Sequence, residues 1–208
     1  MRLNRTLLLC GFIALLILLS VQICRALWWH HDDETPPSGG RFTLQSAQGP
    51  ISTADFPDHL LVIFFGYTHC PDICPTAMTV VSTAMHKLNP QQRAHVQPIF
   101  ITLDPERDTT QRLKQYTDFF ESHIIGVTGT QAQIDAVAQR FGAFYRKIKL
   151  DSALGYSIDH SAQLYLTNSQ GQILNIVHHS NRAESLLKAI QDTLPQLTAG
   201  TPQQQAGS

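Results

Sequence analysis

An uninterrupted apolar run that leads into a loop with two cysteines constrains this chain more than any other feature. Residues 60–65 read LLVIFF, Gly66 ends the run, and Cys70 and Cys74 follow in a loop rich in glycine, proline and aspartate. A run of this kind, bounded by glycine, is typical of a strand buried on both faces, as in the middle of a parallel sheet. The order of strand, thiol-bearing loop and helix therefore predicts an α/β domain.

A helix is expected directly after the second cysteine. Pro75 suits the first turn of a helix, where its missing N–H is not needed. Apolar residues then recur at helical spacing between positions 78 and 88 and give this helix one apolar face. We expect Cys74 at the helix N-terminus, where unpaired N–H groups and the helix dipole favour a thiolate. The alternative is that both thiols are buried and act as small apolar residues.

The charge balance argues against a nucleic-acid-binding protein. The 208 residues include 15 Lys and Arg against 16 Asp and Glu, for a net charge of −1. A nucleic-acid binder would carry a strongly basic surface. The length leaves room for one domain with a substantial core and an appendage.

The appendage is an apolar N-terminal segment. Residues 6–24 carry no charge and would span roughly 28 Å as a helix, about the thickness of the hydrocarbon layer of a membrane. Arg2 and Arg5 precede this segment, whereas Arg25 is soon offset by acidic residues. The positive-inside rule then predicts a single-pass anchor with the N-terminus in the cytoplasm and the soluble domain outside. We expect the membrane to be a bacterial inner (cytoplasmic) membrane, with the domain on its periplasmic or extracytoplasmic side. A cleaved signal peptide is the alternative, but no small-residue cleavage site follows.

This topology divides the chain into five parts. We predict a cytoplasmic N-terminus, a transmembrane anchor, a tether, a soluble domain and a disordered tail, at residues 1–5, 6–27, 28–40, 41–196 and 197–208. Cys10 and Cys24 then lie in the anchor as apolar filler. Only Cys70 and Cys74 belong to the soluble domain, in a compartment where thiols tend to oxidise, so this pair needs either a reductant or a metal.

The soluble domain alternates strands and helices. A hairpin is expected around the turn at residues 48–50, and further strands at 96–103, 124–127, 144–150, 163–167 and 173–177. Helices are expected after Asp108, Thr130 and Asn181, each of which can cap a helix N-terminus. Residues 151–159 are expected to be irregular. Functional residues of such a sheet lie at the C-terminal ends of its strands, so the thiols and the acidic turn at 104–108 should share one face.

Two thiols with the spacing Cys-x-x-x-Cys allow either reversible disulfide formation or the capture of a metal by two thiolates. Thiolates favour Cu(I), with zinc as competitor. His160, just ahead of the strand at 163–167, is a candidate third ligand. His69 and Asp72, beside the cysteines, could contact the metal or a partner. The acidic turn could hold a metal or a partner, or simply cap a helix in solvent.

Three separated motifs closely resemble the Sco/SenC family of copper chaperones. They are GYTHCPDICPTAM at 66–78, TLDPERDT at 102–109 and YSIDHSAQLYLTN at 156–168. The resemblance implies a thioredoxin-like fold, with a central mixed sheet flanked by helices and an N-terminal hairpin, preceded here by the anchor. It also implies delivery of copper to the binuclear copper site of cytochrome c oxidase. By position, the thiolate ligands fall on Cys70 and Cys74 and the imidazole ligand on His160.

We therefore expect a metallochaperone that holds one copper ion, as Cu(I) or Cu(II). Its expected partners are the copper-site subunit of cytochrome c oxidase or another cuproprotein, and a thiol reductant. The alternative is a thiol–disulfide reductase in which Cys70 and Cys74 form the redox pair and His160 tunes a thiol pKa. A general disulfide exchanger is disfavoured, because its usual Cys-x-x-Cys spacing is one residue shorter and residues 158–162 contain no proline.

Overall fold

The computed structural model describes residues 3–29, 37–121, 123–152, 155–178 and 182–199, and divides the chain at position 36/37 into two compact units. The described residues of the first unit form the helix α1 (Leu3–Trp29), in which the described side chains are those of residues 11–25. Over the described part of the chain, no helix combines the length and apolar character needed to cross a membrane. The predicted anchor at 6–27 is not supported by this finding and stays a prediction.

The second unit is built on a five-stranded mixed sheet with the strand order β5-β4-β3-β8-β9. The central strand β3 runs parallel to β4 and antiparallel to β8. This is the α/β arrangement with a mixed central sheet that the sequence predicts. The strands are β3 (Leu60–Gly66), β4 (Val96–Thr102), β5 (Ile125–Val127), β8 (Gln163–Thr167) and β9 (Ile173–His178).

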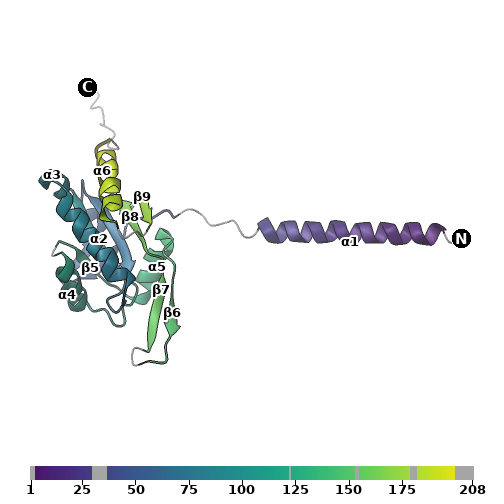
Figure 1. Ribbon diagram of the computed structural model, residues 1–208, viewed down its shortest axis with the longest axis horizontal. Coiled ribbons are helices and arrows are strands. Elements are labelled where there is room, and N and C mark those ends of the chain that lie inside the picture. The colour runs from purple at the N-terminus through teal and green to yellow at the C-terminus, as the bar shows by residue number, and fades with distance from the viewer. Residues whose placement is uncertain (1–2, 30–36, 122, 153–154, 179–181, 200–208) are drawn as a thin grey trace, which may run out of the picture. The chain divides into compact units, whose positions relative to one another are not determined.

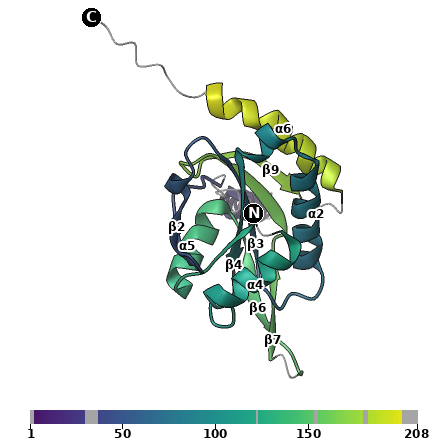
Figure 2. The same cartoon turned by 90° about the vertical axis from the view of Figure 1, so that its left-hand side faces the viewer.

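Helices cover both faces of this sheet. Figure 2 shows α2 and α6 on one side, and α5 with the N-terminal hairpin on the other. The hairpin consists of β1 (Thr43–Ser46) and β2 (Gly49–Ser52), followed by the short helix η1 (Thr53–Asp55). The remaining helices are α2 (Ile73–Lys87), α3 (Pro90–Arg93), α4 (Thr110–Phe120), α5 (Gln131–Phe141) and α6 (Ala183–Ala199).

The central strand is buried on both faces, as its apolar run predicts. All seven residues of β3 are buried. Because side chains alternate along a strand, Phe64 meets Phe100 on one face, with 6.1 Å between ring centroids. Phe65 meets Phe141 of α5 on the opposite face, at 5.6 Å. The strand is thereby fixed from both sides, and so is the loop that leaves its C-terminal end.

A separate two-stranded sheet carries His160. Strands β6 (Tyr145–Lys149) and β7 (Tyr156–His160) pair antiparallel, with Tyr145 opposite His160. In Figure 1 this β6–β7 ribbon extends beyond the five-stranded sheet. The prediction of an irregular stretch up to residue 159 was wrong at its C-terminal end, because residues 156–159 belong to β7. Their pattern is weakly apolar, with one residue of β7 buried, so their strand conformation depends on pairing with β6.

Helix α2 begins two residues earlier than its proline predicts. Its N-cap is Asp72, so Pro75 is the third helical residue and still lies in the first turn, where its missing N–H costs nothing. The capping box predicted for α5 is confirmed, since Thr130 accepts a hydrogen bond from the N–H of Gln133 and the Gln133 side chain accepts one from Thr130. Asn181, the predicted cap of α6, lies outside the described residues.

The structured part of the second unit extends further toward both termini than the sequence predicts. Gly39 and Gly40, which lie in the predicted tether, donate backbone hydrogen bonds to the carbonyls of Arg140 and Gly171 at 2.9 and 2.8 Å. At the other end, α6 continues to Ala199, two residues past the start of the predicted tail.

The packing of α5 against the central sheet can be tested directly at Phe141. Phe141 is fully buried and contacts the rings of Phe42, Phe65 and Tyr165. We expect Phe141→Ala to lower the free energy of unfolding by about 3–5 kcal/mol, because it removes apolar contacts and leaves a cavity. Chemical denaturation of the reduced chain measures this loss.

Phe119→Ala is the matched control, because Phe119 is 83% exposed. The same substitution there should change the free energy of unfolding by no more than about 0.5 kcal/mol. Similar losses in the two variants would contradict the packing described for α5.

Candidate metal centre

The cysteine pair lies where the loop after β3 meets the first turn of α2. Cys70 lies in the loop after the strand, and Cys74 is the second residue of α2. The backbone N–H of Cys74 donates a hydrogen bond to Sγ of Cys70 at 3.4 Å. Cys74 is fully buried, whereas Cys70 keeps 9% of its surface exposed. The first turn of α2 therefore buries the Cys74 thiol in the core and places the Cys74 N–H against Sγ of Cys70.

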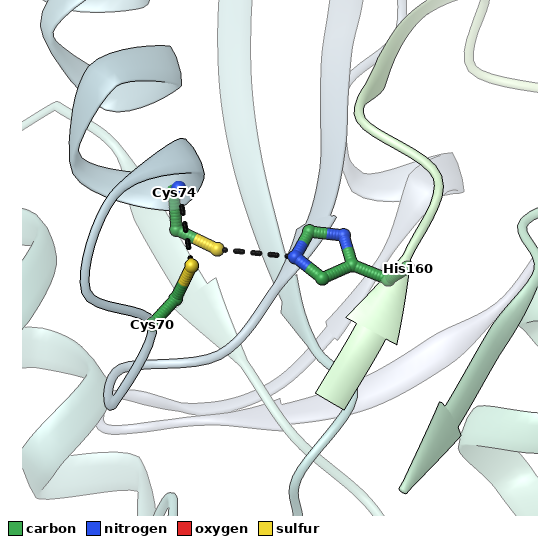
Figure 3. A group of neighbouring side chains, drawn as sticks. All are labelled: Cys70, Cys74 and His160. Carbon is green, nitrogen blue, oxygen red and sulfur yellow. Dashed lines mark hydrogen bonds between the residues drawn. The ribbon is translucent and has the colours of Figure 1, made fainter. Parts of the chain in front are cut away.

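His160 faces the cysteines from the last position of β7, as Figure 3 shows. Its Nε2 lies 3.4 Å from Sγ of Cys74, and its Nδ1 lies 3.0 Å from the carbonyl oxygen of Ser161. A carbonyl oxygen only accepts, so Nδ1 carries the proton and Nε2 of the neutral ring presents a lone pair. A histidine whose second nitrogen donates to a backbone carbonyl is the usual arrangement of a metal ligand.

The three side chains form one compact donor set. Sγ of Cys70, Sγ of Cys74 and Nε2 or Nδ1 of His160 all lie within 4.8 Å of one another. Among the residues that the structure describes, these are the three histidine, cysteine or carboxylate side chains that lie close enough together to hold a metal ion. The rings of Phe64 and Tyr67 pack edge-on against the imidazole, with centroids 6.2 and 5.9 Å away, and limit its movement.

The two thiols differ sharply in acidity. The pKa of Cys70 is lowered to about 3, chiefly by the neighbouring Cys74 thiol and further by His160 and the N–H groups of Asp72 and Cys74. Burial of Cys70 opposes this effect. Burial and the neighbouring Cys70 raise the pKa of Cys74 far above its ordinary value. The pair therefore holds one negative charge, on Cys70.

This assignment corrects the prediction that the helix N-terminus favours a thiolate at Cys74. The Cys74 side chain is fully buried, and this burial opposes ionisation of its thiol. A Cβ added to Gly66 would lie 2.8 Å from Sγ of Cys74 and 2.9 Å from the Phe64 ring. Glycine at the end of β3 therefore provides the space for this sulfur, while the N–H at the helix start stabilises the neighbouring thiolate.

A buried carboxylate holds the cysteine loop against β4. Asp108 is fully buried and accepts hydrogen bonds from the N–H of Thr68 at 2.9 Å, from Oγ1 of Thr68 at 2.5 Å and from Oγ1 of Thr102 at 2.7 Å. The predicted capping role of Asp108 was wrong, because Thr109 caps α4 by accepting from the N–H of Arg112. The role of Asp108 in holding the cysteine loop was not predicted, whereas the prediction that the acidic turn and the thiols share one face is confirmed.

The two other loop residues singled out in the sequence do not belong to the donor set. Nη2 of Arg112 donates to Nε2 of His69 at 3.1 Å, so this nitrogen is occupied. Burial, and then Arg112, lowers the pKa of His69 and favours the neutral ring that accepts this bond. Asp72 is exposed at the start of α2. Nδ1 of His69 lies 3.8 Å from Oδ1 of Asp108, so His69 belongs to the residues around that carboxylate, whereas Asp72 faces solvent.

Comparisons with known proteins find the same family in sequence and in structure. The family model described as SCO1/SenC matches residues 30–195. An SCO2-like protein of Rickettsia prowazekii is 36% identical over 152 residues, which cover 72% of this chain and 74% of the relative. The mitochondrial SCO2 homolog of Mus musculus is 33% identical over 153 residues, which cover 73% of this chain and 60% of the relative.

Solved structures agree with these matches. ScoI of Arabidopsis thaliana with copper bound is 30% identical, with a TM-score of 0.70 over 76% of this chain and 98% of that one. ScoI of Bradyrhizobium japonicum with copper bound is also 30% identical, with a TM-score of 0.67 over 74% of this chain and 98% of that one. The similarity thus extends over most of the second unit.

The unequal acidity of the thiols predicts how they react. In the reduced, metal-free chain, iodoacetamide should modify Cys70 before Cys74, at a rate that stays nearly constant from about pH 8 to about pH 5. A thiol whose pKa is lowered to about 3 remains a thiolate throughout this range, and the thiolate is the nucleophile. An ordinary cysteine, with a pKa of about 8.5, loses about tenfold in rate per pH unit below that value. Mass spectrometry of the modified peptides measures both rates.

The same chain unfolded in urea is the control, and there the rate at Cys70 should fall with decreasing pH as for an ordinary thiol. Faster modification of Cys74, or the same pH profile before and after unfolding, would contradict the assignment of the charge to Cys70.

Proposed function

This chain belongs to the SCO1/SenC family, and from that premise we propose that it is a copper chaperone whose ion is held by Cys70, Cys74 and His160. The convergence of these three donor atoms within 4.8 Å is the observation that carries the proposal. Thiolates are soft ligands that suit Cu(I), and an imidazole nitrogen suits copper in either oxidation state. The relatives whose structures contain copper belong to the same family.

The burial of the three ligands suits an ion that is bound and then passed on. Cys74 is fully buried and anchors the ion to the fold. Cys70 and His160 keep part of their surface exposed, so they form the outer edge of the site. A partner's thiolates can approach at this edge and replace the ligands one at a time. Copper then moves from ligand to ligand without release into solvent.

The recipient and the location belong to the same proposal. The family resemblance points to the binuclear copper site of cytochrome c oxidase, in that oxidase's copper-site subunit, as the recipient. A thiol reductant keeps Cys70 and Cys74 reduced, because a disulfide cannot bind copper through thiolates. The membrane anchor at 6–27, the cytoplasmic N-terminus at 1–5, the tether at 28–40 and the extracytoplasmic domain at 41–196 rest on the charge and hydropathy pattern of the sequence.

A thiol–disulfide reductase is the second candidate, and the proximity of the two thiols favours it. Cys70 combines a pKa lowered to about 3 with partial exposure, as in thiols that attack disulfides. Cys74 lies close enough to resolve a mixed disulfide, since its N–H already contacts Sγ of Cys70 at 3.4 Å. In this role His160 binds no metal and tunes the thiols.

Copper titration of the reduced full-length chain tests the proposal. We expect one copper ion per chain, lost on Cys70→Ser or Cys74→Ser. His160→Ala should weaken binding by at least about tenfold, or about 1.4 kcal/mol, because it removes one of three ligands. Competition with a chelator of known affinity gives these constants. His86→Ala, an exposed histidine on the same helix as Cys74, is the matched control and should leave the affinity unchanged.

Two outcomes would count against the chaperone. Unchanged affinity in His160→Ala would remove this histidine from the site. Absence of tight copper binding, together with metal-free turnover on a cuproprotein disulfide, would establish the reductase in its place.

A further inference from the structure

The strand that carries His160 is not part of the central sheet. In the described residues β7 pairs with β6, and the two strands form a sheet of their own. Backbone pairing within the ribbon does not fix its position relative to the body of the domain. That position depends on the short connections from α5 to β6 and from β7 to β8, and on contacts between the ribbon and the body.

Tyr156, the first residue of β7, makes the most extensive of these contacts. Its O–H donates to Oδ1 of the fully buried Asp104 at 2.8 Å. The guanidinium carbon of Arg107 lies 3.8 Å from the centroid of the Tyr156 ring, and Nη1 of Arg107 donates to the Tyr156 carbonyl at 3.2 Å. Arg107 also forms an ion pair with Asp104. The turn after β4 thus holds Tyr156 by its ring, its hydroxyl and its backbone.

Further contacts lie on either side of this one. The N–H of Ile158 donates to the hydroxyl of Tyr67 at 3.3 Å, and the Tyr67 ring packs against His160. Nζ of Lys147, on β6, lies 2.8 Å from a carboxylate oxygen of Glu106 and 4.8 Å from the centroid of the Tyr156 ring. Tyr145 of β6 is hydrogen-bonded to Gln131 and Asp135 of α5. The other partners named here belong to the turn after β4 or to the loop that carries the cysteines.

We propose that Tyr156 and Arg107 are positioning residues for the metal centre. By holding the ribbon against the turn after β4, they keep His160 close enough to the cysteine pair to bind the same copper ion. This inference rests on the proposed role of His160 as a copper ligand. Metal–ligand distances tolerate a deviation of only about 0.2 Å. A small displacement of the ribbon therefore removes the imidazole from the ion while both thiolates stay in place, because the cysteines belong to other elements.

The test is a double-mutant cycle on copper affinity in the full-length chain. Tyr156→Leu removes both the ring under Arg107 and the hydroxyl on Asp104. Alone it should weaken copper binding at least about fivefold, and in a His160→Ala background it should cause no further loss, because it acts through that histidine. Arg107→Gln disrupts the same contact from the body and should behave alike. Lys149→Ala is the matched control, since Lys149 is exposed and lies opposite Tyr156 in the ribbon.

A metal-free measurement separates this inference from the proposed function. In the reduced chain without copper, Tyr156→Leu and Arg107→Gln should accelerate hydrogen exchange at the Ile158 amide and leave exchange in β3 unchanged. If His160→Ala does not weaken copper binding but exchange accelerates in this way, the ligand assignment fails and the fastening of the ribbon stands. Unchanged exchange at Ile158 in both variants, or losses of affinity that multiply in the His160→Ala background, would overturn the inference.

Discussion

The close packing of the Cys74 sulfur against Gly66 is the contact on which the metal centre depends. Because glycine ends β3, the sulfur can lie between the strand and the first turn of α2. This placement buries one thiol completely and turns the N–H of Cys74 toward Sγ of Cys70. The resulting pair combines a protonated, fully buried thiol with a thiolate that keeps 9% of its surface exposed. The same packing presents Sγ of Cys74 to the imidazole of His160.

The turn between β4 and α4 organises the surroundings of the centre through two buried carboxylates. Asp108 accepts three hydrogen bonds from Thr68 and Thr102 and so holds the cysteine loop. Asp104 accepts from Tyr156 and so holds the ribbon that ends in His160. Both carboxylates are fully buried, and a buried charge is tolerated only with partners such as these. One acidic turn therefore supports the cysteine side and the histidine side of the site.

Much of this arrangement was predictable from local patterns. The strand β3 and the capping box of α5 follow from an apolar run and from a pair of capping side chains. The donor set followed from the order of three motifs. The role of Asp108 could not be predicted, because a capping carboxylate and a buried brace look alike in sequence. The charge on Cys70 and the strand that carries His160 depend on burial and on pairing with β6, which are tertiary properties.

The coordination of the bound ion shows most directly whether Cys70, Cys74 and His160 form the metal centre. X-ray absorption spectroscopy of the reduced, copper-loaded full-length chain should detect two sulfur ligands and one imidazole nitrogen, and the nitrogen contribution should disappear in His160→Ala. A spectrum with fewer than two sulfur ligands, or one that His160→Ala leaves unchanged, would contradict a centre built from Cys70, Cys74 and His160.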